Sequence, residues 1–274
     1  MSRSNYLDFG GVPAAATLNR SGTLSYLQSL GFGDGDLHQA RHALDNQIEL
    51  NFTFDAVGVN YCDFCLDRIM GGEYEKLRDG RDRCSKCSRI VLSTHEQFVD
   101  EYHRVRRNME MAFGITLETV MTVKMVNARE IAKGTGEFFT PSPGIDSRVL
   151  GYATKTNEGH ALYIENGSPR MAAISTMAHE LTHIWQFTNW NQAEIEKKYG
   201  KKNMLLVHEG MAMWAQIQYL LFIREKETAQ REFAYTLQRD DAYGHGLRIF
   251  VERHPLSITG EVGEDSPFHQ MFPL

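Results

Sequence analysis

The stretch 177–186 reads MAHELTHIWQ, with His179 and His183 four residues apart and Glu180 directly after the first histidine. Residues four apart on an α-helix share one face, about one turn from each other, so both imidazoles can converge on one metal ion. The adjacent Glu180 can then reach a water molecule on that ion. This is the chemistry of the HExxH pattern found in zinc peptidases.

Two ordinary core histidines, satisfied by hydrogen bonds, are the alternative. The surrounding residues favour the metal, because the stretch is otherwise mostly apolar and offers few polar partners for a buried histidine pair. The apolar residues are Met177, Ala178, Leu181, Ile184 and Trp185.

A catalytic zinc needs a third protein ligand and an open fourth position. The stretch VHEGMAMWAQ (207–216) begins a second apolar helix, and we predict Glu209 as the third ligand. Gly210 leaves room beside a crossing helix, whereas His208 would point about 100° away. Glu209 could equally be a solvent-facing glutamate in the first turn, where the helix dipole favours it.

The stretch DDAYGHGLR (240–248) gathers polar groups between two predicted helices. A tetrahedral oxyanion requires a neutral hydrogen-bond donor opposite the general base, and Tyr243 or His245 could supply it. The same two-glycine segment could instead be only a helix cap.

All four cysteines lie in two CxxC pairs, Cys62 with Cys65 and Cys84 with Cys87. Two such turns close a tetrahedron of thiolates around one zinc ion and leave no open position, which is typical of a structural site. Disulfides or redox dithiols are the alternative, but a reducing cytosol disfavours them. We therefore predict a small zinc knuckle, LIM-like or ribbon-like and rich in hairpins, that folds around its metal.

The 274 residues, with 42% hydrophobic and 23% charged residues, are enough for a substantial core. The net charge of −6 gives no general attraction to nucleic acid or to anionic membranes. The N-terminus lacks the pattern of a signal peptide, and no run of eighteen apolar residues occurs. A cytoplasmic protein without membrane contact is the expectation.

The pattern along the chain predicts three parts. Residues 1–54 carry a helix whose apolar face is Leu37, Ala40, Leu44 and Ile48, residues 55–92 form the knuckle, and 93–274 form the main domain. The main domain should begin with a helix that buries Phe98, Tyr102, Val105 and Met109. Three β-rich stretches (118–126, 147–156 and 160–166) follow, with a Gly/Pro loop at 134–144, and then helices near 169–188, 203–223, 228–239 and 244–253. A small mixed sheet followed by helices belongs to the α+β class.

The runs YIENGSPRMAAISTMAHELTHIWQ, VHEGMAMWAQ and DAYGHGLR, preceded by CDFC, LRDGR and CSKC, resemble the DA-one-like zinc metallopeptidases. This family includes the ubiquitin-activated LIM-domain peptidases of plants. The resemblance covers roughly residues 55–255, and it implies a zincin-like peptidase domain of the gluzincin type. It implies that His179, His183 and Glu209 hold zinc and that Glu180 is the general base.

The resemblance further implies that a protein or peptide substrate lies along HALYIEN (160–166) as an edge strand, and it strengthens Tyr243 as the oxyanion donor. Two family positions differ, since His208 replaces a glutamate and His245 an aspartate. Only one four-cysteine site is present, so the tandem LIM modules are missing. The stretch ALDNQIE (43–49) lacks the leading acidic run of a ubiquitin-binding helix, so an ordinary packing helix is favoured and ubiquitin dependence does not carry over.

The sequence therefore predicts a zinc endopeptidase with two zinc ions, one catalytic and one structural. The rival from another class is an inactive zinc-ribbon scaffold that binds a protein partner, but a scaffold has no need of Glu180. Nucleic-acid binding through the basic stretch near the knuckle is disfavoured by the acidic residues within it, Glu73, Glu75, Asp79 and Asp82.

Overall fold

The computed structural model describes residues 60–69, 74–117, 121–136, 150–257, 260, 262 and 266–274. The predicted N-terminal helix and the 43–49 stretch lie outside these residues. Within the described part, no helix is long and apolar enough to cross a membrane.

The cysteine knuckle is built from a hairpin and one helical turn. Strands β1 (Tyr74–Lys76) and β2 (Asp82–Cys84) pair antiparallel, and α3 (Ser85–Ser88) follows directly. Gly80 takes a φ of 92° in the connecting turn, which glycine adopts without strain. The predicted hairpin is therefore confirmed. Leu66 has a φ of 59°, a left-handed conformation that costs a residue with a side chain about 1–2 kcal/mol.

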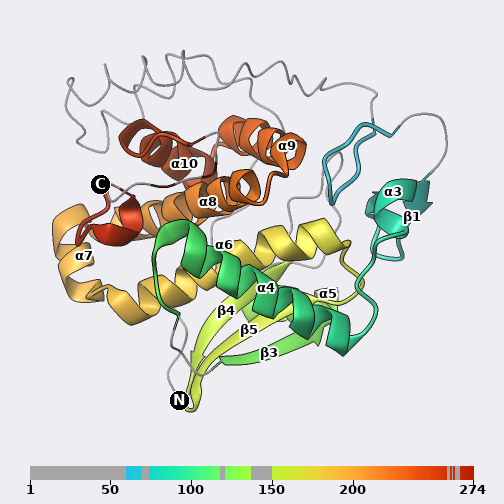
Figure 1. The fold of residues 1–274 in the computed structure, drawn as a ribbon, viewed down its shortest axis with the longest axis horizontal. Coiled ribbons are helices and arrows are strands. Elements are labelled where there is room, and N and C mark those ends of the chain that lie inside the picture. The colour runs from blue at the N-terminus through green and yellow to red at the C-terminus, as the bar shows by residue number, and fades with distance from the viewer. Residues whose placement is uncertain are drawn as a thin grey trace.

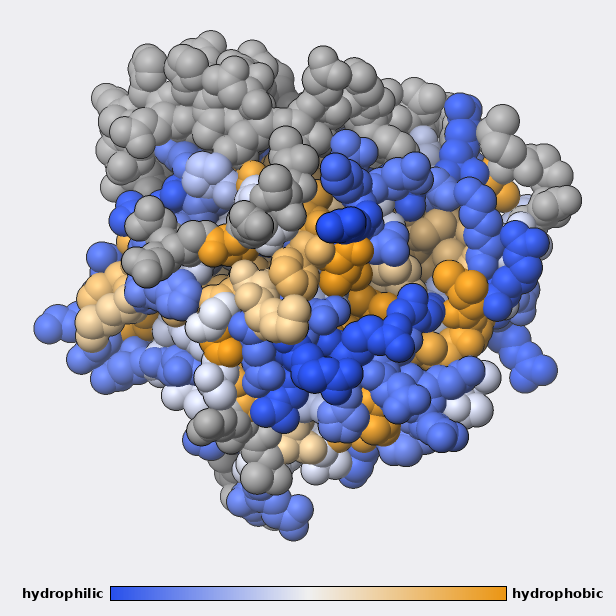
Figure 2. Space-filling model, in the orientation of Figure 1, coloured by the Kyte–Doolittle hydropathy of each residue, from blue (hydrophilic) through white to orange (hydrophobic). Residues whose placement is uncertain are grey.

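Helix α4 (His95–Phe113) starts at a capping box, in which Thr94 and Gln97 bond each other's backbone N–H groups. It ends at Gly114, with a φ of 62°. The stripe Phe98, Tyr102, Val105 and Met109 is almost completely buried, as predicted. Hydrophilic side chains cover much of the outer side of this helix (Figure 2).

The three-stranded sheet has the order β3–β5–β4, with β3 (Met121–Val126) parallel to β5 (Gly159–Glu165) and β4 (Gly151–Thr156) antiparallel to it. The mixed sheet confirms the α+β class. The prediction that residues 160–166 form an edge strand is wrong, because β5 pairs on both sides. Its burial on both faces explains the nearly continuous apolar sequence of this strand.

Helix α5 (Ala128–Thr135) was not predicted from sequence, where only a loop was expected from residue 134. Asn127 and Glu130 form a capping box at its start. This Asn-x-x-Glu signal was visible in the sequence, but the helix has only eight residues, fewer than the window over which helical periodicity is read from sequence.

The C-terminal half is helical, as predicted. The helices are α6 (Arg170–Asn189), α7 (Gln192–Tyr199), α8 (Met204–Phe222), α9 (Lys226–Gln238) and α10 (Ala242–Arg253), with short 3-10 turns at Lys201–Asn203 and Pro267–His269. Four of them match the predicted ranges within about two residues. Helix α7 is additional.

Helix α6 lies between the sheet and α8, and α10 packs on α8 (Figure 1). The α8–α10 contact is very close at Gly210 and Gly246. A Cβ added to Gly246 would lie 2.5 Å from the carbonyl oxygen of Leu206 and 2.6 Å from the Cα of Gly210. Two glycines therefore let α8, the helix that carries Glu209, lie against α10. The sequence predicted for Gly210 that it leaves room beside a crossing helix.

Gly246→Ala should lower the free energy of unfolding by about 1–3 kcal/mol, because the methyl group meets backbone that cannot move away. Alanine's better helix propensity, about 1 kcal/mol, works in the opposite direction. Urea denaturation measures the change, with the exposed α9 position Gln230→Ala as the control. An unchanged midpoint would show that the two helices can separate at little cost.

Candidate metal centre and adjoining cavity

Helix α6 brings the two predicted histidines together on one buried face. The ring centroids of His179 and His183 are 4.8 Å apart, and their Nε2 atoms are 3.1 Å apart. Both residues are more than nine-tenths buried. The spacing of four residues therefore produces the convergence that the sequence predicted.

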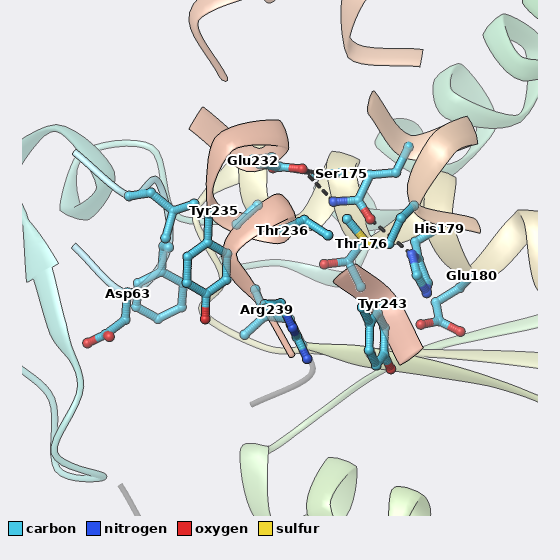
Figure 3. A pocket seen from close by; sticks show the side chains of 17 residues that line it. Asp63, Ser175, Thr176, His179, Glu180, Glu232, Tyr235, Thr236, Arg239 and Tyr243 are labelled. Carbon is cyan, nitrogen blue, oxygen red and sulfur yellow. Dashed lines mark hydrogen bonds between the residues drawn. The ribbon is translucent and has the colours of Figure 1, made fainter. Parts of the chain in front are cut away.

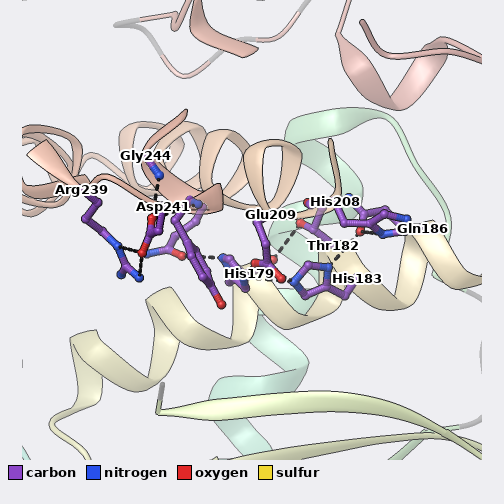
Figure 4. A network of polar contacts seen from close by, with 12 residues as sticks. His179, Thr182, His183, Gln186, His208, Glu209, Arg239, Asp241 and Gly244 are labelled. Carbon is purple, nitrogen blue, oxygen red and sulfur yellow. Dashed lines mark hydrogen bonds and ion pairs between the residues drawn. The ribbon is translucent and has the colours of Figure 1, made fainter. Parts of the chain in front are cut away.

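Glu209 reaches the same point from α8. Its Oε2 lies 3.2 Å from Nε2 of His179 and 3.4 Å from Nε2 of His183 (Figure 4). Glu209 is 9% exposed, so the alternative of a solvent-facing glutamate is wrong. The ring nitrogens of His208 instead bond Gln186 and Gln192, so this histidine points away from the centre.

The three donor atoms have the spacing of zinc ligands. Nitrogen and oxygen ligands lie about 2.0–2.1 Å from zinc, so the edges of a tetrahedral site measure about 3.3–3.4 Å. The observed edges of 3.1, 3.2 and 3.4 Å are close to this value. His179, His183 and Glu209 could thus hold a metal ion, and within the described part of the chain no fourth His, Cys, Asp or Glu joins this group.

Two glutamines fix how the histidines face this point. Gln186 donates from Nε2 to the backbone carbonyl oxygen of His208, because a carbonyl oxygen can only accept. The other amide atom of Gln186, Oε1, therefore accepts from Nδ1–H of His183. Gln216 likewise turns its Nε2 to Glu232 and its Oε1 to Nδ1 of His179. Both Nε2 lone pairs are thereby directed toward the shared point, as metal-binding histidines require.

The charges in this cluster attract one another strongly. Burial alone would lower the pKa of His183, but the neighbouring Glu209 carboxylate raises it to about 9. Burial opposes ionisation of Glu209, yet the two histidines hold its pKa well below the ordinary value. Glu209 is therefore ionised at neutral pH, ready to balance the charge of a cation or of a proton on His183.

Glu180 lies beside this centre, on the side of a cavity. Burial raises the pKa of its carboxyl group, while the two histidines partly oppose the rise, and the backbone N–H of Ala153 in β4 donates to it. A carboxyl group with a raised pKa next to a metal position can accept a proton and return it. The sequence placed Glu180 on the helix, whereas its contact with β4 depends on the tertiary fold.

The cavity has a volume of about 160 Å³, and His179, Glu180 and Tyr243 are among the residues that line it (Figure 3). The ring of Tyr243 lies 6.0 Å from the ring of His179, and the Arg239 guanidinium lies 4.4 Å from the centroid of the tyrosine ring. The predicted oxyanion donor Tyr243 thus stands at the cavity that Glu180 faces.

The other candidate donor, His245, is not among the residues that line the cavity. Its Nε2 bonds Asp240 at 2.8 Å and its Nδ1 faces Arg248 at 3.0 Å, within α10 and the preceding turn. Burial and the charge of Arg248 lower its pKa. Asp241 caps α10 by accepting from two backbone N–H groups, so the segment also has the capping role that the sequence left open.

Three polar residues of the site were not predicted: Gln186, Gln216 and Glu232. Gln186 follows His183 by one helical turn and Gln216 follows Glu209 by two turns, so helical spacing offered a weak signal for both. Glu232 comes from α9 and accepts from Ser175 Oγ at 2.8 Å and from Gln216. Only the packing of α9 against α6 and α8 brings it there.

The four cysteines form a second cluster, in which all the thiols are free. Their sulfur atoms lie within 4.8 Å of one another, and Sγ of Cys65 is 3.7 Å from Sγ of Cys84. A tetrahedron of sulfurs about 2.3 Å from zinc has edges of about 3.8 Å. Hydrogen bonds to Cys62 and Cys65, together with burial, raise the pKa of Cys87. Four thiolates at this spacing would repel one another without a cation among them. The cluster fits the predicted zinc knuckle.

Comparisons with protein-family models, with curated proteins and with solved structures found no match. The chemistry of these two clusters and of the cavity is therefore the basis for a function.

His183→Ala should reduce the bound zinc by one ion per chain and leave the cysteine site loaded, because it removes one of three donors. Elemental analysis of the purified chain measures this. His208→Ala is the matched control, since that ring faces away from the donors. Equal zinc in His183→Ala and the wild type would remove His183 from the metal centre.

Cys84→Ser should lower the melting temperature by roughly 5 °C or more, equivalent to about 2 kcal/mol, because small four-thiolate modules depend on a bound metal for folding. Thermal unfolding followed by circular dichroism measures the shift. Arg89→Ser, an exposed position just after the second CxxC pair, is the control. A melting temperature equal to that of the wild type would argue against a structural metal.

Proposed function

We propose that this chain is a zinc-dependent endopeptidase that hydrolyses peptide bonds of a protein substrate. The observation that carries the proposal is the triangle of Nε2 atoms and carboxylate oxygen with edges of 3.1–3.4 Å, beside a cavity that Glu180 faces. A purely structural metal site has no use for a buried carboxyl group next to an open position.

The arrangement of elements supports a zincin-like domain of the gluzincin type. The HExxH residues lie on one long helix over a mixed sheet, and the third donor comes from the next long helix, α8. This agrees with the resemblance to the DA-one-like peptidases. The substitutions at His208 and His245 fall on residues that bond glutamine and aspartate side chains rather than the metal point.

Zinc held by His179, His183 and Glu209 would supply Lewis-acid activation of water and of the scissile carbonyl group. The chain's own residues would then move the proton. Glu180 accepts it at the carboxylate as water attacks the carbonyl carbon, and returns it to the leaving amine nitrogen. The raised pKa of Glu180 suits both transfers.

Tyr243 is the proposed donor to the oxyanion that forms on the substrate. Its ring stacks at 22° to that of His179, and Arg239 over its other side restrains the ring. A hydrogen bond held ready in this way stabilises the transition state more than the ground state.

An extended substrate would lie along β4, not along β5. Strand β4 has β5 on one side in the described sheet, and Ala153 within it reaches Glu180. Leu150 and Gly151, at the start of this strand, also line the cavity. Backbone pairing with such an edge strand would hold a peptide beside the metal centre.

Glu180→Gln should abolish hydrolysis, with a loss of at least about 10²-fold in rate, while zinc content and melting temperature stay at wild-type values. The glutamine keeps the shape of the side chain but cannot accept the proton. Cleavage of unfolded protein substrates, followed by mass spectrometry, measures the rate, with the exposed turn residue Glu158→Gln as the control.

A Glu180→Gln variant that cleaves at the wild-type rate would remove this residue from the role of base. A wild-type chain that holds two zinc ions and cleaves no substrate would contradict the peptidase. It would favour a zinc-ribbon scaffold instead.

A further inference from the structure

The cysteine knuckle supplies one wall of the cavity at the metal centre. Phe64 and Leu66, from the loop of the first CxxC pair, line the same cavity as His179 and Glu180. Both knuckle residues are buried, 8% and 7% exposed. A module that served only to bind its own metal would not need to contribute side chains to this cavity.

Leu66 occupies its place at a conformational cost. Its N–H donates to the carbonyl oxygen of Cys62 at 2.9 Å, which closes the turn and requires the φ of 59°. Glycine adopts this conformation without strain, whereas leucine does not. A strained residue whose side chain faces a cavity indicates that the side chain itself has a use there.

Contacts from the main domain hold this wall in position. The Arg81 guanidinium lies 4.7 Å from the centroid of the Phe64 ring and forms a buried ion pair with Glu165 of β5. Arg231 of α9 donates to the carbonyl oxygen of Cys65 at 2.9 Å. The wall is therefore preformed rather than assembled by a ligand.

The charged side chains around the cavity are already paired with protein groups. Glu232 accepts from Ser175 and Gln216, and Arg239 bonds Asp241 at 2.6 and 2.9 Å. On the knuckle side, Phe64 and Leu66 are apolar, and the carboxylate of Asp63 accepts a hydrogen bond from the backbone N–H of Asp82. The volume of about 160 Å³ is close to the roughly 150 Å³ of a cavity that accepts a benzene ring, so its size suits a side chain between leucine and phenylalanine.

We infer that Phe64 and Leu66 of the knuckle form a specificity pocket, which receives an apolar side chain of leucine to phenylalanine size from a peptide bound at the metal centre. This inference rests on the proposed function for the identity of the ligand. With this pocket, the knuckle contributes to substrate recognition in addition to forming a folded metal-binding module.

Binding of peptide hydroxamates to the zinc-loaded full chain tests the pocket without requiring turnover. Two hydroxamates are compared by calorimetry, identical except for an isobutyl or an indolylmethyl side chain next to the zinc-binding group. The wild type should prefer isobutyl. Leu66→Gly should shift the ratio of the two dissociation constants by about tenfold toward indolylmethyl, because the pocket is enlarged.

Leu77→Ala is the matched control. Leu77 packs on the same knuckle cluster but is not among the residues that line the cavity. This variant should leave the ratio unchanged even where it lowers stability. Phe64→Leu is the second test variant, and it should also shift the ratio toward the larger side chain.

An equal ratio in the wild type, Leu66→Gly and Phe64→Leu would overturn the inference, as would a zinc-loaded wild type that binds neither hydroxamate. The expected shift in a chain that cleaves no peptide would leave the pocket established while the proposed hydrolysis fails. Cleavage of peptides by a chain whose ratio of dissociation constants is unchanged in both variants would support the proposed hydrolysis and contradict the pocket.

Discussion

The close crossing of α6 and α8 is the constraint on which the candidate site depends. Helix α6 can bring His179 and His183 to within 3.1 Å at Nε2, but two donors do not complete a site. Glu209 reaches them only because α8 lies against α6, and α8 is in turn backed by α10 at the Gly210–Gly246 contact. A methyl group at either glycine would push against backbone atoms, and backbone moves less readily than side chains in a close-packed interior.

The polar groups around the donors follow from the same packing. Gln186, Gln216 and Glu232 come from three different helices. Gln186 and Gln216 bond the two donor histidines directly, and Glu232 accepts from Gln216. Inside the protein every such group must find a partner, since an unpaired buried amide or carboxyl group is costly. The network therefore fixes the direction of both imidazole rings while it satisfies its own members.

The knuckle and the helical domain share an interface that links the two clusters. Arg81 is 3% exposed and pairs with Glu165, while Arg231 and Glu232, neighbours on α9, bond the knuckle and the histidine network respectively. A buried ion pair contributes little net stability but strongly disfavours arrangements in which either charge loses its partner. The knuckle is thus fixed in orientation, which matters because its loop borders the cavity.

The sequence by itself determined the features that depend on short spacings: the convergence of His179 and His183, the two CxxC turns, the buried stripe of α4 and most helix boundaries. These follow from local periodicity, which a single segment carries. The tertiary structure decided the rest. It buried Glu209 against the two histidines where the sequence also allowed a solvent-facing position, turned His245 toward Asp240 and Arg248, and made β5 the middle strand instead of an edge. It also brought Phe64 and Leu66 to the cavity. Each of these outcomes depends on contacts between residues far apart in the chain, and the energy of such contacts comes from how whole elements pack, which no local pattern encodes.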